Sequence, residues 1–214
     1  MGWKSSVWSK EDEKQDCLMN TRIKEVVRES ISAKQALLAD EQLLQVLEQV
    51  VHACVEAFGA GKKVLFCGNG GSAADAQHLA GELSGRFYID REPLFAEAMH
   101  VNTSFLTAVA NDYSFEEAYA RMVRAAGRQG DILFALSTSG NSLNILSAID
   151  SAHRMGMKVV GMTGRKGGKL PELCDFILRA PSDNTPRIQE CHILMGHIIC
   201  ELVEAAIFGE NKPG

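Results

Sequence analysis

Short apolar runs alternate along the chain with longer stretches of helical composition, a pattern typical of an α/β fold. Runs with the length and flanking residues of strands occupy residues 64–67, 95–99, 131–136, 158–163 and 176–178. Helical stretches lie between and after them, from residue 73 and at 104–110, 115–126, 143–155 and 187–208. Strands alternating with helices through short loops predict a parallel sheet with helices on both faces.

The residues before the first strand are predicted to form two helices. Apolar residues recur at helical spacing over residues 21–38, and Asp40 is placed to cap a second helix that ends near Gly59. The apolar stripe is wider than one helix face, with Leu44 and Val51 expected on its exposed part, so residues 21–60 are predicted to help build an oligomer. Residues 1–20 are polar and lack periodicity, which predicts a flexible extension to one domain at 21–214.

Composition argues against several classes of protein, namely nucleic-acid-binding, disulfide-stabilised and membrane proteins. The 214 residues are 46% hydrophobic and carry a formal net charge of −5, which argues against nucleic acid as a partner bound through a general basic surface. The six cysteines form no CxxC pair and suit buried thiols in a reducing compartment. No apolar run approaches the roughly 18 residues of a membrane span. We therefore expect a soluble, cytoplasmic protein with no membrane partner.

A glycine-rich loop, GNGGS at 68–72, joins the first strand to a helix. Such a loop lets a ligand approach the backbone, and the N-terminus of the following helix favours an anion. His78 and Glu82 follow at i and i+4, on one face of that helix. Two other interpretations stay open here: a turn with no ligand, and a dinucleotide site in which Glu97 would be the ribose-binding acid.

A second loop favours a small phosphorylated ligand over a dinucleotide. The sequence STSGNS at 137–142 follows the strand 131–136 and holds four hydroxyl side chains at another helix N-terminus, although capping needs only one. Ligands of open α/β sheets bind beyond the carboxyl ends of the strands, where the strand order reverses. Two such loops suit a small molecule with one phosphate and several hydroxyls.

Four motifs together closely resemble the phosphoheptose isomerases, which are sugar isomerase (SIS) domain enzymes. They are GNGGSAADAQHLAGEL from residue 68, Asn111-Asp112, STSGNS from residue 137, and TPRIQE from residue 185. The resemblance covers residues 21–208. It implies a flavodoxin-like parallel sheet flanked by helices and a homotetramer with active sites between subunits. It also implies interconversion of sedoheptulose 7-phosphate and D-glycero-D-manno-heptose 7-phosphate, at the entry to heptose synthesis for lipopolysaccharide and ADP-heptose.

The resemblance also implies a role for each matching residue. The phosphate would be bound by Ser137, Thr138, Ser139 and Ser142. The sugar would contact Asn69, Gly70 and Gly71, with Ser72 adjoining, and also Asn111, Asp112, Glu82 and Gln189. A zinc ion, Zn2+, would be bound by His78, Glu82, Gln189 and His197.

The chemistry of aldose–ketose isomerisation suits two of these residues. Glu82 is expected to move the proton between C1 and C2, and His197 to serve the oxygens. Spacing alone does not pair Gln189 with His197, because eight helical residues span about 12 Å, and His192 is an equally visible candidate. Some relatives of the family are non-catalytic tetramers that bind the bacterial replication initiator protein, and these lack the glutamate and histidine found here at Glu82 and His197.

Overall fold

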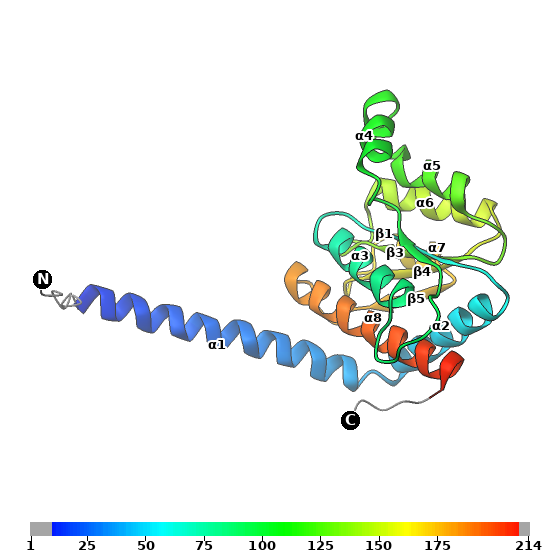
Figure 1. The fold of residues 1–214 in the computed structure, drawn as a ribbon. Helices are drawn as coiled ribbons and strands as arrows, with labels where there is room; N and C mark the ends of the chain where they lie inside the picture. Colours follow the sequence, from blue (N-terminus) through cyan, green and yellow to red (C-terminus); the bar gives the residue numbers. More distant parts are fainter. Residues whose placement is uncertain (1–9, 210–214) are drawn as a thin grey trace, which may run out of the picture.

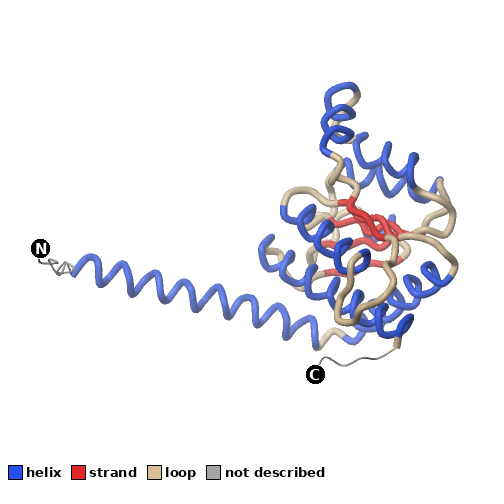
Figure 2. Tube along the Cα trace, viewed as in Figure 1, coloured by secondary structure: helices blue, strands red, loops and turns tan. Residues whose placement is uncertain are grey.

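Five parallel strands form the centre of the structure, a computed structural model that describes residues 10–209, with side chains from residue 18 onward (Figure 2). The strands are β1 (Val64–Cys67), β2 (Ala96–Ala98), β3 (Ile132–Leu136), β4 (Lys158–Thr163) and β5 (Phe176–Arg179). Their order in the sheet is β2-β1-β3-β4-β5, which is the flavodoxin-like order. The predicted fold class is confirmed, and the strand order reverses between β1 and β3.

Alternate residues of each strand face opposite sides of the sheet, and each side has its own apolar core. Val64 and Phe66 of β1 belong to the core under α2, α3 and α8, whereas Leu65 and Cys67 belong to the core under α5 and α6. Phe66 stacks on Phe134 of β3 with ring centroids 4.8 Å apart. Both strands are buried throughout, as their continuous apolar sequences predict.

Helices cover both faces of the sheet (Figure 1). One layer contains α2 (Glu41–Gly59), α3 (Gly71–Ser84) and α8 (Thr185–Phe208), and the other contains α5 (Glu117–Ala126) and α6 (Leu143–Arg154). The helix α4 (Thr103–Asp112) lies at the outer end of this second layer, next to α5. These bounds agree with the prediction to within a few residues, but the short α7 (Leu170–Leu173) was not predicted.

The first helix, α1 (Lys10–Leu38), begins earlier than predicted and extends away from the sheet (Figure 1). Residues 10–20 are therefore helical, and residues 1–9 of the predicted flexible extension lie outside the described range. Only the C-terminal part of α1 packs on the body, where Ala33 and Leu37 are buried. Ile23, Val27 and Ile31 remain 49–58% exposed on the single chain.

The second helix, α2, begins at its predicted cap but buries residues that were expected on the surface. Asp40 Oδ1 accepts a hydrogen bond of 3.0 Å from the backbone N–H of Leu43. Val51 is only 7% exposed, and Leu44 is half-buried against the core. The expectation of an exposed stripe through these two residues is wrong, because α2 packs against both α8 and β5.

The last helix, α8, is long and apolar enough to cross a membrane, judged by length and composition alone. The prediction concerned an uninterrupted apolar run, and α8 contains polar and charged residues such as Glu190, His197 and Glu201 among its apolar ones. Packing in the core accounts for the composition of α8, because Ile188, Met195, Ile199 and Val203 are buried against the sheet and the neighbouring helices.

Candidate active site

The loop between β1 and α3 is a tight turn that only glycine can form. Gly70 has φ +56°, and a Cβ on Gly68 would lie 2.3 Å from the carbonyl oxygen of Ser72. The N–H groups of Ser72, Ala73 and Ala74 bond to carbonyls of Asn69 and Gly70, so the turn satisfies part of the helix N-terminus itself. Ser72 is 3% exposed, so its hydroxyl lies under the loop rather than on it.

The hydroxyl loop lies at the carboxyl end of β3, beside the glycine loop. Ser137 Oγ is 2.9 Å from Ser142 Oγ, and Ser139 Oγ accepts from the N–H of Asn141 at 3.2 Å. Ser142 precedes α6, but its side chain makes no capping hydrogen bond. The hydroxyls of Ser137 and Ser142 thus bond to each other rather than cap the helix, and Ser137 is buried.

A pocket of about 330 Å³ opens beside the hydroxyl loop. Its lining includes Thr138 and Ser139, the cations Arg165 and Lys166, and one carboxylate, Asp183. Two cations next to hydroxyl groups suit a phosphate. Arg165 and Lys166 were not predicted, although their place in the glycine-rich loop after β4 is a signal that could have identified them.

Two asparagine side chains join the glycine loop to the first turn of α6, across the point where the strand order reverses. Asn69 Nδ2 donates to Asn144 Oδ1 at 2.9 Å, and Asn144 Nδ2 donates to Asn69 Oδ1 at 2.8 Å. The predicted sugar ligand Asn69 therefore has its side chain bonded to Asn144, which is 3% exposed and was not singled out from the sequence. The pair fixes the separation of the two loops.

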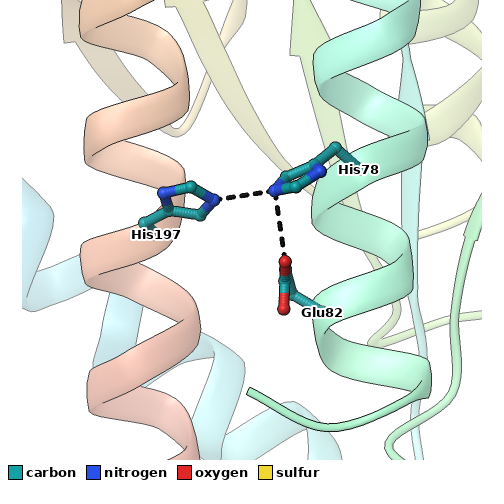
Figure 3. Close-up of side chains that lie close together, drawn as sticks. All are labelled: His78, Glu82 and His197. Atoms are coloured by element: carbon teal, nitrogen blue, oxygen red, sulfur yellow. Dashed lines mark hydrogen bonds and ion pairs between the residues drawn. The ribbon is translucent and has the colours of Figure 1, made fainter. Parts of the chain in front are cut away.

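Two histidines and one glutamate form a cluster between α3 and α8 (Figure 3), consisting of His78, His197 and Glu82. His78 Nε2 lies 2.8 Å from His197 Nε2 and 3.1 Å from Glu82 Oε1. One ligand atom from each residue lies within 4.8 Å of the others. Two imidazole nitrogens and one carboxylate oxygen at such distances fit a three-residue zinc site with a further open position. The structure therefore brings together three of the four predicted metal ligands.

The fourth predicted ligand, Gln189, lies on α8 beside the start of α3. A Cβ on Gly71 would lie 2.4 Å from Gln189 Nε2, so the amide is packed against the start of α3. His192 is instead a core residue, with no exposed surface and Nε2 3.2 Å from the carbonyl of Thr163. Burial lowers the pKa of His192 to about 4. Of the two histidines in question, only His197 faces the cluster.

Asp75 was not predicted, but it lies on the same face of α3 as His78 and Glu82. Its Oδ2 is buried and has no hydrogen-bond partner among the described residues. Burial raises the pKa of Asp75 to about 6, and the nearby His78 acts in the opposite direction. This carboxylate lies one helical turn from His78, the first residue of the cluster.

Asn111 and Asp112 are the two predicted site residues that lie apart from the rest. They end α4, are exposed, and bond to each other through Asn111 Nδ2 and Asp112 Oδ1 at 2.9 Å. Their helix packs on α5 in the outer layer. Nothing within the one described chain brings them to the loops or to the cluster.

Comparisons with known proteins agree with this geometry. A family model described as SIS domain matches residues 29–164, more than half of the chain. The phosphoheptose isomerase of Aneurinibacillus thermoaerophilus is 51% identical over 194 residues, covering 91% of this chain and 98% of that protein. The enzyme of the same name from Burkholderia pseudomallei is 50% identical over 191 residues, covering 89% and 97%.

Solved structures show the same relationship. The phosphoheptose isomerase of Neisseria gonorrhoeae superposes with a TM-score of 0.82 at 40% identity, covering 87% of this chain and 99% of that one. The phosphoheptose isomerase of Francisella tularensis gives a TM-score of 0.83 at 40% identity, covering 86% and 97%. Since fold and sequence agree over nearly the full length, the chain belongs to the phosphoheptose isomerase family of SIS-domain proteins.

Proposed function

We propose that the protein interconverts sedoheptulose 7-phosphate and D-glycero-D-manno-heptose 7-phosphate. The observation that carries this proposal is the convergence of His78, Glu82 and His197 in a chain of this family. The family's non-catalytic relatives lack the glutamate and the histidine, so that alternative is not favoured. The product would enter heptose synthesis for lipopolysaccharide or related glycans through ADP-heptose.

The reaction moves one proton between C1 and C2 and another between the two oxygens. Glu82 is the base that takes a proton from one carbon and returns it to the other, since its side chain is 25% exposed at the cluster. His197 serves the oxygens, because an imidazole can both donate and accept a proton near neutral pH. The distance of the phosphate from these carbons lets it anchor the sugar without taking part in the proton transfers.

The donor set fits zinc, with His78, Glu82 and His197 as ligands and Gln189 as a fourth by resemblance. A zinc ion there would supply Lewis-acid stabilisation of the enediolate. Glu82 has two carboxylate oxygens, so ligation through one oxygen leaves the other for the proton.

The phosphate is assigned to the hydroxyl loop and its pocket. Ser137, Thr138, Ser139 and Ser142 supply hydroxyls, and Arg165 and Lys166 supply positive charge from the loop after β4. Gly70 and Gly71 let the sugar approach the backbone at the start of α3. The Asn69–Asn144 pair holds the two loops at a fixed separation, which sets the length of sugar phosphate that reaches both.

The working molecule is proposed to be a homotetramer in the cytoplasm. The exposed apolar residues of α1 support assembly, and the separate position of Asn111 and Asp112 supports sites completed by another subunit. The described cysteines are free thiols, mostly buried, as expected in a reducing compartment.

The decisive experiment measures turnover of sedoheptulose 7-phosphate by wild type, Glu82→Gln and Glu48→Gln. Glu82→Gln is expected to lower kcat by about 10²–10⁴-fold, because an amide cannot accept the carbon-bound proton. Glu48→Gln makes the same change on an exposed face of α2 and should leave kcat unaltered. Activity of Glu82→Gln within a few-fold of wild type would remove Glu82 from the mechanism. Chelator should abolish wild-type turnover, and added zinc should restore it.

A further inference from the structure

A buried ion pair lies two turns beyond the cluster, between the loop that follows α3 and the helix α8. Glu204 accepts hydrogen bonds from the backbone N–H groups of Phe87, Tyr88 and Ile89 at 2.9, 2.7 and 3.1 Å. Arg91 Nε donates to the same carboxylate at 2.6 Å. The side chains of Arg91 and Glu204 are 2% and 3% exposed. Four hydrogen bonds therefore converge on one carboxylate shielded from water.

Arg91 also caps the C-terminal end of α3. Its Nη2 donates to the carbonyl of Glu82 at 3.0 Å, and its Nη1 donates to the carbonyl of Leu83 at 3.0 Å. The last carbonyls of a helix have no partner within the helix, so a guanidinium placed there satisfies them and complements the helix dipole. One of these carbonyls belongs to Glu82, the proposed base.

The same loop touches the other catalytic residue. The ring of Phe87, whose N–H is held by Glu204, packs against the ring of His197 with centroids 5.7 Å apart. His197 and Glu204 lie on the same helix, α8, seven residues apart. The ion pair thus acts on α3 through Arg91 and on His197 through Phe87.

The groups around Glu204 favour the charged form of its carboxyl. Burial alone would raise the pKa of Glu204, but the N–H groups of Phe87 and Tyr88 and the guanidinium of Arg91 outweigh it and lower the pKa. Glu204 therefore stays ionised at neutral pH. Breaking such a pair leaves a buried charge without its partner, so the loop must move.

We infer that Glu204 and Arg91 are positioning residues that hold the loop 85–91 against both helices and thereby fix Glu82 and His197 relative to each other. The inference rests on the proposed function. Proton transfer and metal binding both depend on sub-ångström placement of these side chains. The phosphate loop lies at the end of β3, away from this ion pair, so it should not respond to its loss.

The test compares Glu204→Gln with Asp131→Asn. Asp131 is a matched control, because it is also a buried carboxylate and accepts from the N–H groups of Lys63 and Arg128 and from Lys63 Nζ. It precedes β3, so it lies at the amino ends of the strands, whereas the loops lie at their carboxyl ends. Both variants remove one buried negative charge, but only Glu204→Gln disturbs the cluster.

Three quantities are measured below the unfolding temperature of every variant: kcat, KM for sedoheptulose 7-phosphate, and zinc affinity by competition with a chelating dye. Glu204→Gln is expected to lower kcat and zinc affinity at least about tenfold each, with KM within about twofold of wild type. Asp131→Asn should lower only the thermal midpoint. Wild-type kcat and zinc affinity in Glu204→Gln, or equal losses in both variants, would overturn the inference.

A second variant covers the case in which Glu204→Gln does not fold. Phe87→Leu keeps an apolar side chain but removes the ring that contacts His197, and it is expected to lower kcat several-fold at unchanged KM. Wild-type kcat in Phe87→Leu would overturn the inference in that case. If the wild type shows no turnover, the proposed function fails, whereas zinc affinity still ranks the variants and decides on the positioning role.

Discussion

At the scale of single residues, His192 makes stability depend on pH. Its pKa is about 4 in the folded protein, below the ordinary value of 6.5, because burial disfavours the charged ring. The unfolded chain therefore takes up a proton as the pH falls through 6.5, before the folded chain does, and stability declines until the pH falls below about 4.

We predict that wild type loses about 2 kcal/mol more unfolding free energy between pH 7 and pH 5 than His192→Gln does. Glutamine can still donate to the carbonyl of Thr163 but does not titrate, so the comparison cancels the contribution of other groups. Urea unfolding of both proteins at equal concentration measures the difference. Parallel declines would show that His192 is not the group responsible.

At the scale of elements, the contact between α3 and α8 depends on two glycines. A Cβ on Gly196 would lie 2.4 Å from Leu79 Cδ1, and a Cβ on Gly71 would lie 2.4 Å from Gln189 Nε2. The first neighbour is part of the core, but the second is the end of a flexible side chain. Enlarging Gly71 therefore costs little stability and displaces the amide.

We predict that Gly71→Ala keeps its thermal midpoint within a few degrees and loses about tenfold in kcat/KM. Gly59→Ala is the control, since its Cβ would meet nothing within 4 Å, and it should behave as wild type. Thermal unfolding and the isomerase assay provide the two measurements. Full activity in Gly71→Ala would mean that Gln189 is not needed at its place beside Gly71.

Some elements are predictable from the sequence and others are not, for physical reasons. Strand β3 and the cap at Asp40 were predictable because burial and capping leave local signals. The start of α1 was not predictable from apolar periodicity, because that pattern indicates which helix face is buried. Residues 10–17 have no such pattern, and they continue the helix with mainly good helix formers such as Glu, Lys and Gln.

The candidate site could likewise be predicted only in part from the sequence. His78 and Glu82 share one helix face, so their spacing predicts a pair. His197 lies 119 residues from His78, and only the resemblance selected it over His192. Arg91 and Glu204 lie 113 residues apart and have no local motif, so their pairing emerges only from the fold.

At the scale of the whole molecule, α1 predicts assembly. Its last turns pack on the body, while Ile23, Val27 and Ile31 form an exposed row at helical spacing. We predict that the 23.3 kDa chain is not a monomer, and that Ile23→Glu with Ile31→Glu dissociates it, because burying two unpaired carboxylates costs several kcal/mol.

Light scattering alongside the isomerase assay tests this assembly. If Asn111 and Asp112 complete a neighbouring site, dissociation and loss of activity should occur together. Lys24→Glu adds negative charge to the same helix without altering the row, and it should remain assembled and active. A fully active monomer would contradict both the interface and the shared site.

The order of the elements along the chain, with α8 after all five strands, has a consequence for biosynthesis. Both ligand loops are complete once β4 has been translated, but Gln189, His197 and Glu204 all belong to α8. Domains fold as units during synthesis, with the N-terminal parts emerging first. A nascent chain that lacks α8 therefore leaves one core face of the sheet uncovered and cannot assemble the cluster, so catalytic competence requires that α8 has been translated.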